Sequence, residues 1–301
     1  MPAVDLSELP TTESRITYNK RDLLIYACGI GEEDFRYTYE LNKDFQAFPS
    51  IPVVLGGYSQ DVTDFSKRAG GGFNVPGVKL DLTKLLDGER MIELYNPLPL
   101  ESKGELIARG RTTGVYDIGK ACIMESETVI SDASGKKYAK IIGRAFFRDA
   151  GGFGGPAPPK PPPEATPPKT PAHKVVVTPT RVEQAQLYRL SSDYNPLHID
   201  PVFSGKVGFK VPILHGLCSY AQGVRAVLQA YGENDGRRLV SYRTRFTHPV
   251  LPGQTLSTEL WKVKEDAETI TVAFQSTIKE IGKVALGGGV AVLKKSSSPK
   301  L

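Results

Sequence analysis

Hydrophobic residues in the second half of the chain follow two different periods. Between residues 214 and 231 the apolar positions recur every three or four residues, at Leu217, Tyr220, Ala221, Val224, Val227 and Leu228. This spacing predicts one buried helix, which Gly232 would end. Four stretches rich in strand-forming residues follow, and we expect strands over 237–246, 255–264, 269–278 and 284–293, separated by turns that contain Pro, Gly or acidic residues.

The first half shows a similar series of strand-forming stretches. Strand-forming stretches occupy residues 90–95, 104–116, 120–131 and 138–147. Two copies of one α+β fold are therefore expected, each an antiparallel sheet packed around a helix.

A segment rich in proline and glycine separates the two halves. Residues 151–171 read GGFGGPAPPKPPPEATPPKTP and contain nine of the chain's 23 prolines. Such a stretch sustains neither a helix nor a sheet, so we expect an extended linker over residues 151–172. It would divide the chain into a first domain, 1–150, and a second domain, 173–301.

Composition narrows the class of protein. The chain is 40% hydrophobic and 24% charged, and its net charge of +5 favours small anionic ligands over nucleic acid. The three cysteines are widely spaced and form no zinc or disulfide pattern, which is typical of a reducing compartment. The first ten residues do not resemble a secretory signal, and the longest apolar stretch, 284–293, is too short to span a bilayer.

Candidate chemistry lies in the second half, because all four histidines follow residue 172. Asp193 and His198 are five residues apart, and Pro196 forces Asn195 out of the helical region. A turn there would bring the carboxylate and the imidazole toward a common point. The alternative is a capped turn of purely structural value, in which Asp and Asn side chains bind the backbone.

A second cluster, His215-Gly216, stands at the start of the predicted helix. Backbone N–H groups at a helix N-terminus are unpaired and favour negative charge. An acid–base pair together with such a donor is suited to hydrating an unsaturated thioester, since negative charge develops on the thioester oxygen as water attacks C3.

These motifs resemble the hydratase 2 family, the (R)-specific enoyl-CoA hydratases. Residues 188–204 match its signature at Asp193, Asn195, Pro196, Leu197, His198 and Ser204, while Ser192 stands where the family has glycine. Residues 92–99, 212–218 and 252–256 agree as well, so the similarity covers nearly the whole chain outside the linker. The resemblance implies a tandem (double) hot-dog fold, in which each half is an antiparallel sheet wrapped around a long central helix.

The resemblance also implies roles for particular residues. Asp193, His198 and Asn195 would be catalytic, and the Gly216 N–H would bind the thioester oxygen. The first half would be a non-catalytic hot-dog domain that shapes the acyl pocket. The implied substrate-binding residues are Asp87, Gly88, Lys120, Tyr194, Pro196, Leu197, His215 and Phe246.

Two of these assignments have qualifications. The family's lysine in an Asp-Lys-Gly turn is absent here, and Lys120 stands two residues further along the same face of the strand. Phe246 is equally well interpreted as a core aromatic on a strand.

The implied activity is the hydration of (2E)-enoyl-CoA to (R)-3-hydroxyacyl-CoA in fatty acid β-oxidation, by a homodimer without metal or organic cofactor, nucleic acid or membrane insertion. Pro299-Lys300-Leu301 resembles a peroxisomal import signal that an import receptor would read, although a plain polar tail and a cytosolic enzyme are the alternative. The rival functions are a hot-dog acyl-CoA thioesterase and a non-catalytic acyl-CoA binding module.

Overall fold

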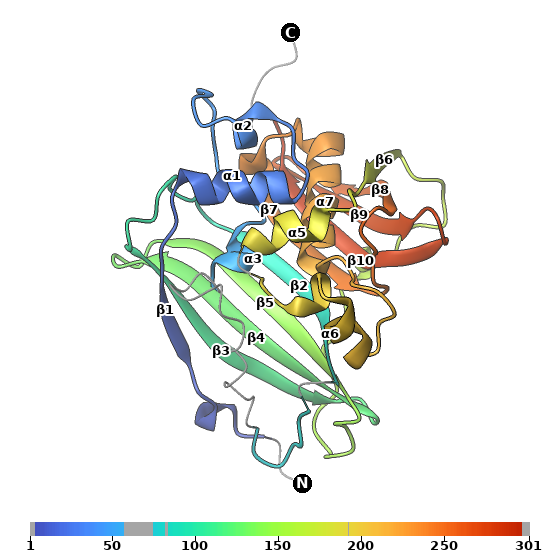
Figure 1. Ribbon diagram of the computed structural model, residues 1–301. Coiled ribbons are helices and arrows are strands. Elements are labelled where there is room, and N and C mark those ends of the chain that lie inside the picture. The colour runs from blue at the N-terminus through green and yellow to red at the C-terminus, as the bar shows by residue number, and fades with distance from the viewer. Residues whose placement is uncertain (1–3, 57–74, 82–83, 192, 297–301) are drawn as a thin grey trace.

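The computed structural model describes residues 4–56, 75–81, 84–191 and 193–296. Its main feature is one ten-stranded antiparallel sheet that curves around a buried helix (Figure 1). The strands of the first half are β1 (Thr12–Ile16), β2 (Leu85–Leu94), β3 (Leu106–Asp117), β4 (Ala121–Asp132) and β5 (Lys137–Arg148). Those of the second half are β6 (Lys174–Pro179), β7 (Leu239–Phe246), β8 (Thr255–Glu265), β9 (Thr269–Ile278) and β10 (Lys283–Lys294).

The strand order reveals an internal repeat. The sheet runs β1-β3-β4-β5-β2-β7-β10-β9-β8-β6, so the first half has the order 1-3-4-5-2 and the second has the equivalent order 6-8-9-10-7. The halves join where β2 pairs with β7, from Glu89 opposite Arg245 to Glu93 opposite Ser241. The predicted double hot-dog fold is confirmed, with its seam at these two equivalent strands.

The eight strands expected from the sequence are all present, and β9 has the predicted bounds. Only β1 and β6 were not predicted. They are the two edge strands of the sheet, where one side of the backbone has no neighbour and side chains are largely exposed. Their sequences, TESRI and KVVVTP, therefore lack the alternation that marks a half-buried strand.

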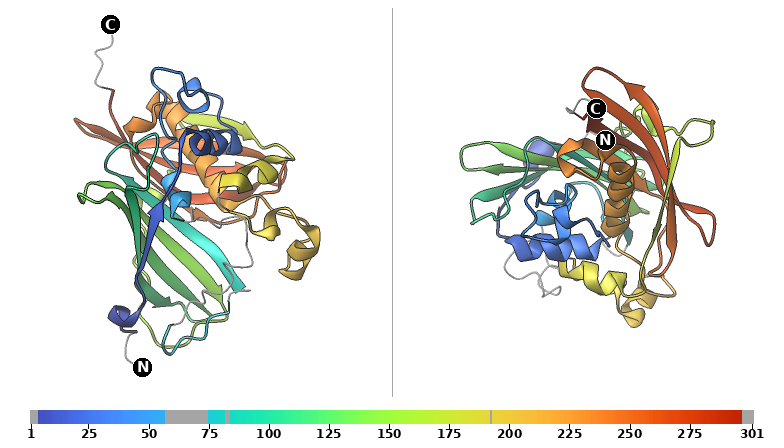
Figure 2. Two further views of the ribbon diagram at one scale, coloured as in Figure 1. Left: turned by 60° about the vertical axis from the view of Figure 1, so that its left-hand side comes forward. Right: turned by 90° about the horizontal axis from the view of Figure 1, so that it is seen from above.

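The predicted helix of the second half is α7 (Gly216–Val227), which continues through a π-helical turn, Leu228–Gly232. Nine of its twelve residues are buried, because the helix lies within the curve of β7–β10 (Figure 2). The described first half has no helix of this length: α1 (Lys20–Gly29) has ten residues, and α2 (Phe35–Thr38) and α3 (Pro52–Leu55) have four each. The helices α5 (Gln184–Tyr188) and α6 (Pro201–Lys206) flank the predicted catalytic segment.

The proline-rich segment is held at both ends. The Asp117 carboxylate accepts the backbone N–H groups of Gly152 and Gly154, at 3.0 and 2.7 Å. Further along, the indole N–H of Trp261 donates to the Thr170 carbonyl at 2.8 Å. The segment contains a single short 3₁₀ turn, Pro163–Ala165, as its composition predicts. Whether it separates two independent domains stays a prediction.

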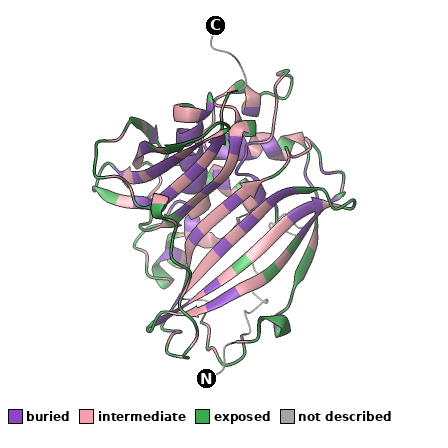
Figure 3. Cartoon of the chain, turned by 180° about the vertical axis from the view of Figure 1, so that it is seen from behind, coloured by how far each residue is buried: buried purple, intermediate pink, exposed green. Residues whose placement is uncertain are grey.

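One hydrophobic core spans both halves. Its largest fully buried side chains include Tyr26 from α1, Tyr220 from α7 and Tyr242 from β7, and buried positions recur along the strands (Figure 3). No helix among the described residues is long and apolar enough to cross a membrane.

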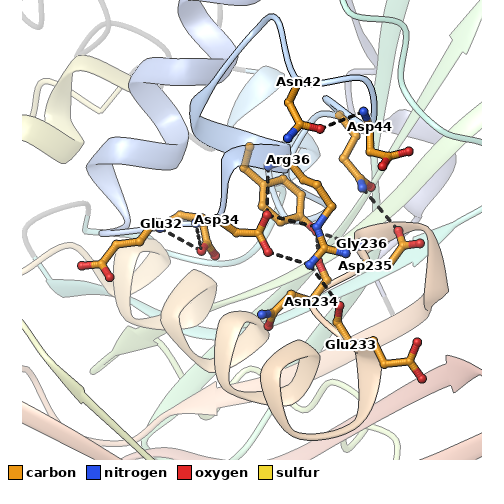
Figure 4. Close-up of polar contacts among 12 residues, drawn as sticks. Glu32, Asp34, Arg36, Asn42, Asp44, Glu233, Asn234, Asp235 and Gly236 are labelled. Atoms are coloured by element: carbon orange, nitrogen blue, oxygen red, sulfur yellow. Dashed lines mark hydrogen bonds and ion pairs between the residues drawn. The ribbon is translucent and has the colours of Figure 1, made fainter.

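Polar contacts fix α2 to the loop that follows α7 and its π-helical turn (Figure 4). Arg36 forms an ion pair with Asp34 at 2.6 Å and donates to the Glu233 carbonyl at 3.0 Å. The Tyr37 hydroxyl donates to the Asn234 carbonyl and accepts the Gly236 N–H, both at 2.7 Å. The first half is thereby anchored to the element that begins at the predicted oxyanion donor.

Candidate active site

A short loop between α5 and α6 carries the candidate catalytic residues. The Asp193 carboxylate accepts the Asn195 N–H at 3.2 Å, and the Asn195 side chain caps the 3₁₀ turn Pro196–His198 by accepting the Leu197 N–H at 3.0 Å. The capped-turn interpretation is thus correct for the local fold. The same turn also brings His198 to Asp193, so the structural and the catalytic interpretations are compatible.

The His198 ring has a defined proton position. Its Nδ1 lies 2.9 Å from the Ile213 carbonyl, which can only accept, so Nδ1 carries the hydrogen and Nε2 carries the lone pair in the neutral ring. Nε2 lies 3.8 Å from Asp193 Oδ2. Burial lowers the pKa of His198, although the Asp193 carboxylate and the bond to Ile213 oppose the change. His198 is therefore a neutral base near pH 7.

His215 packs against the face of His198. The two ring centroids are 3.7 Å apart and the planes differ by 26°. His215 Nε2 donates to the Asp193 backbone carbonyl at 3.1 Å, and burial lowers the pKa of this histidine to about 2. Because its side chain is only 1% exposed, the implied substrate contact of His215 stays a prediction that its position does not favour.

Gly216 is the first residue of α7. No hydrogen bond from its backbone N–H is found within the described parts of the chain, as expected in the first turn of a helix. A Cβ at this position would lie 3.4 Å from the ring of Phe246, so the strand residue that the resemblance implicates lies beside the candidate donor.

The first half contributes Asp87 through an irregularity in β2. The pairing of β2 with β5 shifts register between Asp87 and Glu89, and a Cβ on the intervening Gly88 would lie 2.9 Å from the Arg144 carbonyl oxygen. Burial raises the pKa of Asp87, the nearby Arg90 opposes the rise, and the Asp193 carboxylate adds to it. Asp87 therefore lies close enough to Asp193 for the two charges to interact.

The other predicted residues lie in varied settings. Arg189 stacks on the Tyr194 ring, 4.7 Å from its centroid, and Pro196 and Leu197 are half-buried in the loop. Lys120 is exposed in the turn between β3 and β4. Among the described residues, its side chain forms no hydrogen bond or ion pair with the catalytic loop between α5 and α6. Ser192 and the tripeptide Pro299-Lys300-Leu301 lie outside the described residues.

Sequence reasoning missed two neighbours of the site. The Tyr188 ring lies 4.9 Å from the His215 ring, and Arg189 places a positive charge near that histidine. Both residues stand at the start of the segment 188–204 that matches the family signature, but spacing along a chain carries no signal for ring stacking. Ser204, which matches the motif, is fully buried and donates to the Phe209 carbonyl at 3.2 Å, so its role is structural.

Asp193, His198 and His215 offer ligand atoms that lie within 4.8 Å of one another. The two imidazoles are stacked, and each turns one ring nitrogen to a backbone carbonyl, Nδ1 of His198 to Ile213 and Nε2 of His215 to Asp193. The nitrogens left with a lone pair are Nε2 of His198, which lies 3.8 Å from the Asp193 carboxylate, and Nδ1 of His215, which is buried. The arrangement is better suited to holding a water molecule.

Comparison with known proteins relates both halves to characterised families. Residues 163–284 match the MaoC like domain, and residues 16–149 match the MFE-2 hydratase 2 N-terminal domain. The chain is 36% identical over 285 residues to a probable enoyl-CoA hydratase 2 of Dictyostelium discoideum, and this match covers 93% of the chain and 92% of the relative.

Two further relatives extend the comparison. The chain is 35% identical to the peroxisomal multifunctional enzyme type 2 of Drosophila melanogaster over 95% of its own length, but it spans only 47% of that longer protein. The crystal structure of a MaoC-like dehydratase from Phytophthora capsici is 38% identical, covers 97% of the chain and 98% of that structure, and superposes with a TM-score of 0.85.

Proposed function

The chain belongs to the hydratase 2 family of MaoC-like proteins, and we propose that it adds water to (2E)-enoyl-CoA, forming (R)-3-hydroxyacyl-CoA as a hydro-lyase of fatty acid β-oxidation. The observation that carries this proposal is the gap of 3.8 Å between Asp193 Oδ2 and His198 Nε2. The gap is too long for a direct hydrogen bond. It suits one water molecule that donates to both acceptors.

The reaction then follows from the two bases. The held water attacks C3 of the enoyl thioester and gives a proton to the Asp193–His198 pair, and the electrons of the double bond move to C2 and the thioester oxygen. The Gly216 N–H stabilises that oxygen, an interaction worth on the order of 3 kcal/mol. The pair returns a proton to C2 from the same side, which completes the addition and regenerates both bases.

Asn195 acts alongside them. Its Oδ1 is engaged as the cap of the 3₁₀ turn, so its amide nitrogen is the group that can donate to the water. Phe246, packed against Gly216, would line the pocket where the thioester binds.

The rival functions predict different chemistry. A thioesterase would direct the water at the carbonyl carbon and release free CoA, whereas a binding module would retain the pocket without turnover. A basic imidazole nitrogen facing a carboxylate across a water-sized gap supports addition over simple binding.

Purified protein should consume crotonyl-, decenoyl- and hexadecenoyl-CoA, which is followed as loss of enoyl thioester absorbance. Chiral analysis should identify the (R)-3-hydroxyacyl product. Release of free thiol without loss of the double bond would favour a thioesterase, and no turnover of any of the three substrates would contradict the proposal.

The first half is proposed to accommodate long acyl chains. It contains a cavity of about 250 Å³ lined by residues of β1–β5 and by α3, where Val53, Ala108 and Ile141 lie beside polar residues such as Arg90, Ser126 and Thr128. We expect Ala108→Leu, which adds side chain volume there, to lower kcat/KM for hexadecenoyl-CoA by about 10-fold. Crotonyl-CoA, whose acyl chain has only four carbons, is the internal control, and equal losses for both substrates would contradict this division of labour.

Chelation provides a separate test of the metal-free mechanism. Because one of the two free imidazole nitrogens, Nδ1 of His215, is buried, we expect exhaustive dialysis against EDTA to leave kcat unchanged. Loss of activity that a divalent cation restores would mean that the Asp193–His198–His215 cluster binds metal in the working enzyme.

Location and assembly are also proposed from the family. Relatives such as the Drosophila enzyme are named as peroxisomal, which supports a peroxisomal location with Pro299-Lys300-Leu301 as the import signal. Deleting these three residues from a fluorescent fusion should leave it cytosolic, and a cytosolic intact fusion would contradict the signal. A homodimer is proposed as well, and sedimentation equilibrium at twice the mass of 32.8 kDa would support it.

A further inference from the structure

Four aromatic rings form a column that ends at the catalytic base. Tyr26 of α1 lies 6.1 Å from Tyr188 at the end of α5, Tyr188 lies 4.9 Å from His215, and His215 lies 3.7 Å from His198. Three of these rings are at most 1% exposed, and only the last, His198, opens toward the site. The column therefore fixes one face of the base from within the core.

We propose that His215 is a positioning residue for the hydration reaction, which holds His198 by stacking and Asp193 by a hydrogen bond to its backbone. This inference rests on the proposed function and deepens it. One ring thus sets both members of the pair that holds the water.

The hydrogen bond to the Asp193 carbonyl determines which nitrogen of the His215 ring carries the hydrogen. The Asp193 carbonyl can only accept, so Nε2 of His215 carries the hydrogen, and Nδ1 is a buried lone pair without a hydrogen-bond partner in the described structure. A buried polar atom without a partner has a cost in stability. In His215→Phe the apolar ring would have no unpaired nitrogen and would avoid that cost, but it could not donate a hydrogen bond to the Asp193 carbonyl.

His215 also stays neutral while His198 changes charge. Burial, the neighbouring His198 and the charge of Arg189 keep the pKa of His215 near 2, so it does not compete for the proton that His198 accepts. The charged and titratable groups that face the two rings are Asp193 on the loop and Arg189 at the end of α5, with Asp87 of β2 acting through Asp193. The stacked ring keeps water from one face of His198 and so contributes to the burial that lowers its pKa.

Two substitutions separate these roles. His215→Gln keeps an N–H donor for Asp193 but removes the stacked ring, so water can reach His198, its pKa rises, and the acid limb of the kcat/KM profile moves to higher pH. His215→Phe keeps a ring and loses the donor, so kcat should fall roughly 10-fold or more through misplacement of Asp193, while the acid limb stays in place. The matched control is His173→Gln, which should change neither quantity, because the His173 side chain is exposed and only accepts the Lys262 backbone N–H.

The outcome has three distinguishable forms. The positioning role is supported if the two variants behave differently. The acid limb should then shift only in His215→Gln, and kcat should fall without such a shift in His215→Phe. Wild-type kcat and an unmoved acid limb in both variants overturn it, as does a loss of kcat in both with no movement of either limb, which is the result of a merely structural role. If the wild-type protein itself hydrates no enoyl-CoA, the proposed function fails first.

Discussion

Asp193→Asn and His198→Gln are each expected to lower kcat for enoyl-CoA hydration by at least about 100-fold, within the usual range for acid–base residues. Asp193→Asn removes a negative acceptor from the water site, and its amide would also present a donor toward the water. His198→Gln removes the lone-pair nitrogen Nε2, which lies 3.8 Å from Asp193 Oδ2. Stopped-flow or steady-state loss of crotonyl-CoA absorbance measures both.

Neither substitution should unfold the protein. Asp193 is 39% exposed at its side chain, and a Gln at position 198 can still donate to the Ile213 carbonyl. Melting temperatures close to that of the wild type would show that the loss is chemical. His173→Gln controls for the removal of a histidine elsewhere, because that side chain is exposed.

The pH profile of the wild-type enzyme gives a related check. Burial lowers the pKa of His198, so the base is neutral and active at pH values below the ordinary histidine value of 6.5. Activity should therefore be lost only as the pH falls through that lowered pKa.

A folded variant of Asp193 or His198 with near-normal turnover would contradict the assignment of the catalytic pair and would reopen the thioesterase and binding-module interpretations.

The fold was largely predictable because its central elements have strong patterns. The buried helix α7 and the eight inner strands show clean helical or strand periods, since each packs one or more faces against the core. The edge strands β1 and β6 do not, because their outer sides face solvent. The hydrophobic periodicity of the sequence thus predicts the buried inner strands of the sheet and misses its two edge strands.

The site was predictable only in part. Asp193 and His198 lie five residues apart, and a proline-containing turn was enough to predict that they meet. The stack of His215 on His198 joins residues 17 apart through the packing of a helix start against a loop, and the approach of Asp87 to Asp193 depends on the seam between β2 and β7. Such contacts are set by tertiary structure, about which a single sequence without an alignment is silent.

That seam contains a chain of charges that we expect to be important for stability. Arg243 of β7 pairs with Glu89 of β2, Glu89 pairs with Arg144 of β5 at 3.0 Å, and Arg144 pairs with Glu125 of β4 at 2.8 Å. The four side chains are between 10% and 19% exposed, so the charges are largely removed from water. Glu89 stands at the centre of this link, since it binds an arginine from each half.

Glu89→Gln is therefore expected to lower the free energy of unfolding by about 3 kcal/mol, because it leaves Arg243 buried without a counter-charge. Glu13→Gln is the matched control: Glu13 also pairs with an arginine on a neighbouring strand, Arg109, at 2.9 Å, but both side chains are more than half exposed. Water screens that pair, and its removal should cost no more than about 0.5 kcal/mol. Urea titration of both variants measures the difference. Similar losses in the two would mean that the seam is held by its backbone pairing and apolar core alone. A large loss confined to Glu89→Gln would show that this carboxylate stabilises the seam between the half that carries the catalytic pair and the half that supplies Asp87.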